Sequence, residues 1–191
     1  MVDWVRSAFT VTLWVWLAAE VLLQARQLRH SGRTKSTEWR SLLVFVVLGA
    51  GVAVLAGPLG RAVPALSYPV GGVLAAVMLV LTWAGIGLRL WSIRTLGRYF
   101  RGTVHIQEGH RVVDWGPYRL VRHPAYTGAL LAGTAAAATF GNAASWLLVT
   151  GGLGLAVGYR IRVEERVLSL ALGEAYTSYA ARTHRLVPGI W

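Results

Sequence analysis

The chain of 191 residues is apolar yet strongly basic: 55% of its residues are hydrophobic, 14% are charged, and the net charge is +11. Its apolar runs are too long for the core of a soluble domain of this size, which indicates an integral membrane protein. Because the chain has no cysteine, disulfides, a thiolate nucleophile and cysteine-bound metal are excluded.

Five apolar windows are suited to membrane helices, since about 20 helical residues cross about 30 Å of hydrocarbon. In chain order they cover residues 5–23, 42–62, 69–90, 125–140 and 143–161. We interpret the first as a retained span and not as a cleaved signal peptide. Glu20 and three tryptophans lie in or beside it, and it has no short apolar core followed by a small-residue cleavage site.

Proline and glycine mark the connections between these windows. The linker between the second and third windows carries Pro58, Pro64 and Pro69. Gly141-Asn142 predicts a tight turn, so the fourth and fifth helices should form a hairpin. We predict an all-α fold, a polytopic membrane bundle of about five transmembrane helices followed by short cytoplasmic helices, the last ending near Thr183. Residues 1–68 would form a two-helix membrane segment, and residues 69–191 a membrane-embedded core.

Basic residues gather in alternate connections. Five lie between the first and second windows, whereas the second window ends with Arg61 alone, and further arginines follow the third and fifth windows. By the positive-inside rule these basic connections face the cytoplasm, which places the N-terminus outside and the C-terminus inside. Anionic headgroups and this bias account for the net charge, so nucleic acid is not expected as a partner.

The polar chemistry gathers in three cytoplasmic segments: the end of the third helix, the connection 105–128, and the tail from Arg160. We expect them to converge on one membrane face. Pro124 suits the first turn of the fourth helix. Arg122 and His123 then stand at a positively polarised helix start, which favours a carboxylate or phosphate. Alternatively, Arg122 reaches lipid phosphate and His123 caps the helix. No His or carboxylate lies at helical spacing from His123, so no metal is expected.

Two glycines and an acid inside the apolar windows also call for an explanation. Gly85 and Gly87 lie two residues apart and so do not share a helix face, which suits a ligand that approaches the backbone; helix packing is the alternative. Glu20 is an intramembrane acid and therefore a functional candidate, or else the partner of an arginine near the cytoplasmic end.

Glu164 and Glu165 follow the fifth window. Adjacent residues point about 100° apart on a helix, so the two acids face different directions, which allows one of them to point into a site. The alternative is an ordinary solvated helix, in which Arg160 pairs with Glu164 and Arg162 with Glu165.

In combination, these residues resemble the isoprenylcysteine carboxyl methyltransferase family and its phospholipid N-methyltransferase relatives. The resemblance covers about residues 83–188. It rests on the order Gly85-x-Gly87, Arg89, Leu96-Gly97, His110, Gly116-Pro117-Tyr118, Arg122-His123-Pro124-x-Tyr126-x-Gly128, and Glu164-Glu165 with Tyr176 and Tyr179.

The resemblance implies a membrane enzyme that transfers the methyl group of S-adenosylmethionine at the cytoplasmic face, with the cofactor held by the C-terminal half and without a metal. The residues it implies for cofactor binding are Gly85, Gly87, His110, Tyr118, Arg122, His123, Pro124, Tyr126, Gly128, Glu164 and Glu165. The candidates for catalysis are Arg89, Arg160 and Glu165. Replacement of Arg122 by alanine should weaken cofactor binding without unfolding the protein.

The expected reaction is an in-line displacement at the methyl carbon, driven by positioning. A carboxylate acceptor would need an arginine to orient it, for which Arg89, Arg160 and Arg162 are candidates. An amine or thiol would need a base, either Glu165 or His123.

The expected partners are the bilayer and a lipophilic small-molecule or lipidated acceptor that enters sideways from the membrane. A prenylated-cysteine-like carboxylate, a phospholipid amine and a small thiol are alternatives. Transport is disfavoured because the second, fourth and fifth windows have no ionisable residue in their apolar centres. A non-enzymatic lipid-binding protein would leave the ordered motifs without a role.

Overall fold

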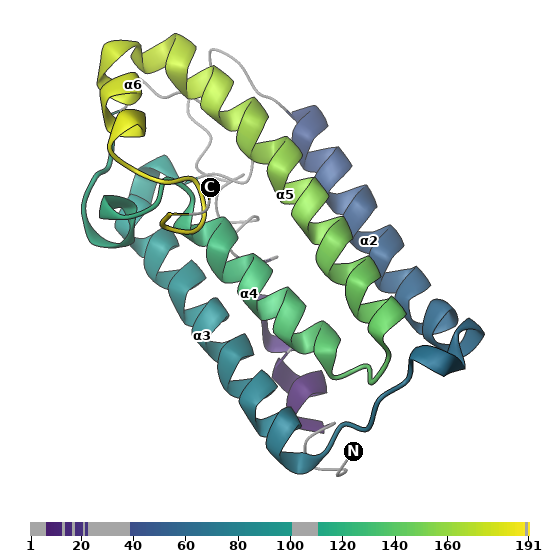
Figure 1. The fold of residues 1–191 in the computed structure, drawn as a ribbon. Coiled ribbons are helices and arrows are strands. Elements are labelled where there is room, and N and C mark those ends of the chain that lie inside the picture. Colours follow the sequence, from purple (N-terminus) through teal and green to yellow (C-terminus); the bar gives the residue numbers. More distant parts are fainter. Residues whose placement is uncertain are drawn as a thin grey trace.

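The computed structural model describes residues 7–12, 14–16, 18–20, 22, 39–100, 111–189 and 191, and this part of the chain is helical without a β-strand (Figure 1). The α-helices are α2 (Trp39–Ala62), α3 (Gly72–Leu96), α4 (Pro124–Ala138), α5 (Ala143–Leu172) and α6 (Glu174–Ala181). Short 3₁₀ turns are η1 (Pro64–Leu66), η2 (Gly97–Tyr99) and η3 (Gly116–Arg119). The described residues between 7 and 22 are also helical. The predicted all-α class is confirmed.

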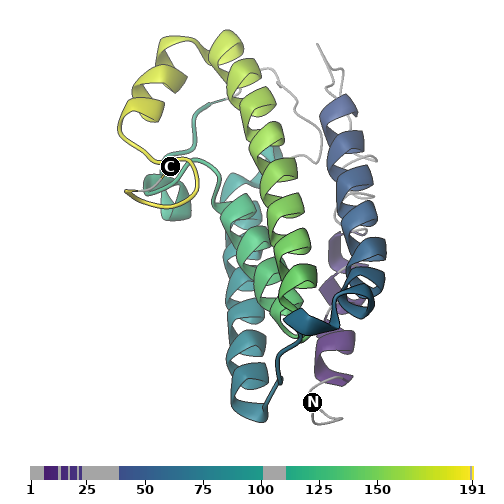
Figure 2. The same ribbon diagram turned by 45° about the vertical axis from the view of Figure 1, so that its right-hand side comes forward.

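Four long helices lie side by side in the order α3, α4, α5, α2 (Figures 1 and 2). The first helical segment packs behind them, where Phe9 meets Ala75 of α3 and Ala136 of α4. Among the described helices, α3 and α5 have the length and hydropathy to cross a membrane. An integral membrane bundle agrees with this finding, while the total of five spans stays a prediction.

The predicted hairpin of α4 and α5 is confirmed, and a polar side chain holds its turn. Gly141 has a φ of +68°, which glycine adopts without steric cost. Asn142 then caps α5, since its Oδ1 accepts from the backbone N–H groups of Ala144 (3.0 Å) and Ser145 (3.2 Å). Its Nδ2 donates to the backbone oxygen of Val63 (2.9 Å). One side chain therefore ties the α4–α5 turn to the end of α2.

The position of Pro58 corrects the predicted linker. Pro58 lies inside α2, and the connection to α3 begins only at Val63. A proline removes one backbone hydrogen bond from a helix, but membrane helices tolerate it where neighbouring groups satisfy the freed carbonyl. The helix boundaries also extend past two predicted windows, because α3 continues to Leu96 and α5 to Leu172.

The crossing of α3 and α4 depends on two glycines. A Cβ atom at Gly85 would lie 2.5 Å from the backbone oxygen of Gly128 and 2.6 Å from the nitrogen of Ala132. A Cβ atom at Gly128 would lie 2.5 Å from the oxygen of Gly85. At Gly87 a Cβ atom would meet nothing within 4 Å. The missing side chain at Gly85 thus permits helix packing, which corrects the expectation that a ligand needs this space.

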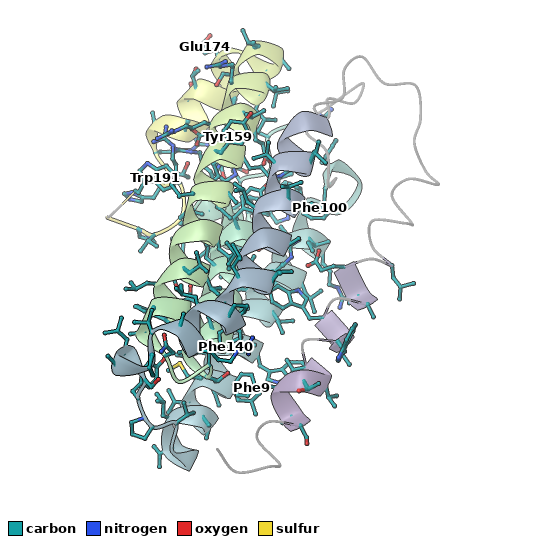
Figure 3. All side chains as sticks on the ribbon, turned by 90° about the vertical axis from the view of Figure 1, so that its right-hand side faces the viewer. Phe9, Phe100, Phe140, Tyr159, Glu174 and Trp191 are labelled. Atoms are coloured by element: carbon teal, nitrogen blue, oxygen red, sulfur yellow. The ribbon has the colours of Figure 1, made fainter. Side chains whose placement is uncertain are left out.

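The three segments expected to converge do so at one end of the bundle as far as the structure describes them, the middle one from residue 111 onward. The end of α3, η3, the start of α4, the end of α5 and α6 gather there (Figure 2). Side chains illustrate the two ends: Phe9 and Phe140 lie toward one, whereas Glu174 and Trp191 lie toward the other (Figure 3). The candidate site belongs to this second end.

We predict that Gly85→Ala destabilises the bundle, because the added methyl group would force the backbones of α3 and α4 apart. The expected loss is about 2 kcal/mol of unfolding free energy, typical of overpacking. Thermal unfolding of the purified protein in detergent measures this loss. Gly87→Ala is the matched control and should leave the melting temperature unchanged or raise it slightly; equal effects of the two substitutions would contradict the packing role.

Candidate functional site

The chain before α4 is held by backbone pairing with a later segment. The N–H of Arg122 donates to the oxygen of His184 (2.7 Å), and the N–H of His123 donates to the oxygen of Arg185 (3.0 Å). Pro124 is the first residue of α4 and disfavours a helical backbone at the residue before it. His123 is accordingly non-helical, with φ −126° and ψ 53°. The start of α4 is therefore fixed against residues 183–191, which we call the strap.

Glu165 of α5 lies at the centre of the site. Its Oε1 accepts from Nε of Arg122 (2.9 Å), and its Oε2 accepts from Nε of Arg185 in the strap (2.9 Å). The ring nitrogen Nε2 of His123 lies 3.4 Å from Oε1. The side chain of Glu165 is only 15% exposed, and two guanidiniums balance the negative charge of its carboxylate.

Arg122 is bound by the chain itself. Its Nε binds Glu165, and its Nη1 donates to the backbone oxygens of Ala180 (2.6 Å) and Thr183 (2.5 Å). The side chain is 9% exposed, and a buried guanidinium needs such partners. The anion expected beside this helix start is therefore a carboxylate of the protein, and Arg122 also holds the end of α6. The prediction that Arg122→Ala weakens cofactor binding without unfolding the protein stays a prediction, to which these contacts add an expected loss of stability.

Glu164 takes part in a separate set of contacts. The hydroxyl of Tyr126 on α4 donates to Oε2 of Glu164 (2.9 Å) and accepts from Nε of Arg160 (2.6 Å). Arg160 is 4% exposed, and the ring of Tyr126 lies 5.8 Å from that of His123. The adjacent acids indeed face different directions. Their interactions reach from α5 to α4 and the strap, which is more than an ordinary solvated helix would show.

Arg89 pairs with Glu20, as the alternative for Glu20 predicted. It binds Glu20 through Nε and through Nη2 (2.7 Å to Oε2), while its Nη1 donates to the backbone oxygen of Ala125 (3.2 Å). The indole of Trp16 donates to the same carboxylate (3.1 Å). Arg89 thus joins the first helical segment to α3 and α4. Because its guanidinium is engaged on several sides, Arg89 is a poor candidate for orienting an acceptor.

Helix α6 places two tyrosines against the site. Gly173, with a φ of +54°, reverses the chain after α5, and Tyr176 and Tyr179 follow on one helix face with 4% exposure each. The hydroxyl of Tyr179 donates to the backbone oxygen of Tyr118 in η3 (2.7 Å). Burial raises the pKa of Tyr179 to about 12, so this hydroxyl keeps its proton at neutral pH. Burial also raises the pKa of the Tyr118 phenol.

The strap is held in place by apolar packing, a hydrogen bond and a cation–π contact. Sequence reasoning did not find these contacts. Leu186 is buried with Val157 and Ile161 of α5, and its backbone oxygen accepts from the hydroxyl of Thr127 (2.8 Å). The guanidinium of Arg185 lies 5.4 Å from the ring centre of Trp191. The sequence showed arginines in this tail, but nothing in their spacing indicated that Arg185 binds Glu165.

The other predicted site residues have different surroundings. Pro124 is fully buried at the start of α4, and Gly128 lies in the helix crossing. Arg162 is exposed on α5. His110 lies outside the described residues. Within the ranges that the structure describes, no cluster of three or more His, Asp or Glu residues could hold a metal ion.

Known proteins of one family are similar to this chain in sequence. Residues 76–170 match the model of the isoprenylcysteine carboxyl methyltransferase (ICMT) family. Rice proteins from Oryza sativa subspecies indica and japonica, each named "Probable protein-S-isoprenylcysteine O-methyltransferase", are 32% identical over 116 residues, which is 60% of this chain and 61% of theirs. "Protein-S-isoprenylcysteine O-methyltransferase B" of Arabidopsis thaliana is 32% identical over 103 residues, or 53% of this chain and 52% of its own.

A solved structure has the same fold. It is that of the eukaryotic intramembrane Ras methyltransferase ICMT, with a TM-score of 0.63 and 24% identity over 76% of this chain and 52% of that chain. The matched part spans about three fifths of the rice relatives and about half of the other two proteins. The fold and site define a membrane-embedded helical protein with a buried charged centre at one end. Residues 76–170, about half of the chain, are similar in sequence to the isoprenylcysteine carboxyl methyltransferase family.

We predict that Arg122→Ala lowers stability as well as any ligand affinity. The substitution removes the guanidinium that pairs with the buried carboxylate of Glu165 and that donates to two carbonyls near the end of α6. The expected loss is about 3 kcal/mol of unfolding free energy. Thermal unfolding gives the total loss, and hydrogen exchange should show the greatest increase in α6. Arg162→Ala removes an exposed arginine from α5 and serves as the control. Unchanged protection of α6 in Arg122→Ala would contradict the assigned contacts.

Proposed function

We propose that this protein transfers a methyl group from S-adenosylmethionine to the carboxylate of a prenylated cysteine, or of an acceptor like it, at the membrane. The supporting observation is the convergence of Arg122, His123 and Tyr126 with Arg160, Glu164 and Glu165. Arg122 and His123 precede α4, Tyr126 lies in its first turn, and the other three lie on α5. All six belong to the family-matched region and form one buried charged centre. The names of the plant relatives supply the substrate class.

The chemistry of the site fits S-adenosylmethionine. The ligand carries an ammonium group and hydroxyls that need acceptors, and the site holds two carboxylates. It also has a buried tyrosine hydroxyl, that of Tyr176, without a hydrogen-bond partner among the described residues. We propose that Glu164, Tyr126 and His123 line the pocket and that Glu165 and Arg122 hold its walls together. Gly87, with open space at its Cβ position, and His110 stay proposed contacts. When bound, the cofactor supplies a methyl group already activated by a sulfonium.

Arg160 is our proposed acceptor-orienting residue. It is 4% exposed and lies at the site through its bond to Tyr126. A guanidinium can hold a carboxylate in a fixed direction by two parallel hydrogen bonds, and positioning supplies much of the rate in such a displacement. Of the three arginines considered, Arg160 contacts Tyr126 of the centre, whereas Arg89 pairs with Glu20 and Arg162 is exposed.

The environment of Glu165 favours a carboxylate acceptor over an amine or thiol. Arg122 and Arg185 both bind this side chain, and nearby positive charge stabilises the ionised form of a carboxylate. Glu165 is thus a weak base for removing a proton from an amine or thiol. A carboxylate acceptor is already ionised at neutral pH and requires no base.

The surface of the helices supports a lipophilic acceptor that enters from the bilayer. Large apolar side chains are exposed on all the long helices, including Val54 on α2, Val73 and Val80 on α3, Leu131 on α4 and Leu155 on α5. We propose that these faces meet lipid, with the N-terminus outside and the site facing the cytoplasm. In this arrangement residues 69–191 form the methyltransferase core, and residues 1–68 add two membrane helices against it.

The reaction is tested with the full chain in liposomes, S-adenosylmethionine with a labelled methyl group, and N-acetyl-S-farnesylcysteine. We expect a base-labile methyl ester on this acceptor. N-acetylcysteine, which lacks the lipid, and the farnesylated methyl ester, whose carboxylate is blocked, should accept far less label. Transfer to the blocked ester or to phosphatidylethanolamine in the vesicles would contradict carboxylate methylation.

We predict that Arg160→Lys lowers kcat/KM for the farnesylated acid about 100-fold, because a point charge replaces the paired N–H groups that orient the acceptor. Affinity for S-adenosylmethionine, measured by calorimetry, should change much less. Arg166→Lys alters an exposed arginine on the same helix and is the control. Equal losses in the donor affinity and in kcat/KM would assign Arg160 to the cofactor.

A further inference from the structure

Tyr176 occupies a site position beyond the family-matched residues. It lies on α6, three residues after the chain reversal at Gly173, and is 4% exposed. Its ring centre is 6.1 Å from that of Tyr179, which anchors α6 to η3 through its own hydroxyl. The match to the family ends at residue 170, so neither the family match nor the predicted site set assigns this tyrosine a role.

The hydroxyl of Tyr176 is buried and lacks a hydrogen-bond partner among the described residues. The hydroxyl of the neighbouring Tyr179 is paired with the oxygen of Tyr118 (2.7 Å), and that of Tyr126 on α4 is paired with Glu164 (2.9 Å). Nearly all buried polar atoms in folded proteins have partners, because an unpaired one costs free energy. An unpaired hydroxyl within a charged site therefore indicates a partner that a ligand supplies.

The charges around this hydroxyl indicate which kind of ligand group suits it. The pKa of Tyr176 is raised, first by burial and then by the negative charges of Glu165 and Glu164, while the positive charge of Arg122 opposes this in part. The phenol therefore keeps its proton at neutral pH. Its oxygen can accept a hydrogen bond, and the two carboxylates favour a cationic donor.

We propose that the Tyr176 hydroxyl is a ligand-binding group that accepts a hydrogen bond from the ammonium at the amino-acid end of S-adenosylmethionine. This inference rests on the proposed function. It gives α6 a direct part in cofactor binding, in addition to its packing against η3. It also gives a role to a buried hydroxyl that has no hydrogen-bond partner among the described residues.

The test compares wild type with Tyr176→Phe by calorimetry, with two ligands used separately. S-adenosylhomocysteine carries the amino-acid end, and 5′-methylthioadenosine lacks it. We expect about tenfold weaker binding of S-adenosylhomocysteine, as for one lost hydrogen bond to a charged group, and unchanged binding of 5′-methylthioadenosine. Tyr159→Phe removes a hydroxyl from a residue that is 44% exposed on α5 and should change neither affinity.

Thermal unfolding without ligand separates binding from a structural role. Since its hydroxyl makes no bond within the described protein, Tyr176→Phe should melt at or above the wild-type temperature. A lower melting temperature with unchanged affinities would assign Tyr176 to the fold and overturn the inference, as would equal losses for both ligands. If the wild-type protein binds neither ligand, the proposed function fails and the inference fails with it.

Discussion

The buried ion pair between Arg122 and Glu165 is the interaction on which the site depends. Taking a guanidinium and a carboxylate out of water is costly, so each must keep its partners. Arg122 stands before α4, Glu165 belongs to α5, and the carbonyls that Arg122 also binds lie at the end of α6 and the start of the strap. One pair therefore fixes several chain segments at the same end. Apolar burial adds to this only where Leu186 of the strap packs against Val157 and Ile161 of α5.

Close backbone contact holds the rest of the bundle and sets the position of Arg89. Gly85 and Gly128 let α3 and α4 approach until a Cβ atom at Gly128 would lie 2.7 Å from the backbone nitrogen of Arg89. At this separation the Arg89 side chain reaches both the oxygen of Ala125 and the carboxylate of Glu20. The packing of small residues and the pairing of Glu20 with Arg89 are thus two consequences of one crossing.

Sequence reasoning succeeded where a local pattern has one structural solution. The apolar windows indicated the helices, and Gly141-Asn142 indicated the hairpin. The ordered motifs indicated the family. It failed where distant segments meet. The spacing of two glycines suggested a ligand, yet a partner helix occupies the space at Gly85. Likewise, the spacing along α5 suggested that Arg162 pairs with Glu165. In the structure Arg185 of the strap, 20 residues away in the chain, binds Glu165. Such contacts depend on where the chain returns, which local periodicity does not encode.

The balance of charge links this fold to the type of acceptor. Three arginines, Arg122, Arg160 and Arg185, surround two glutamates, so the described centre carries one excess positive charge. Bound S-adenosylmethionine would add a sulfonium, an ammonium and a carboxylate, which is one further positive charge. In a site with little water, like charges repel more strongly than at the surface. An anionic acceptor lowers the total charge, whereas a protonated amine raises it. A carboxylate on a lipid-modified chain end satisfies this balance and needs no base from Glu165.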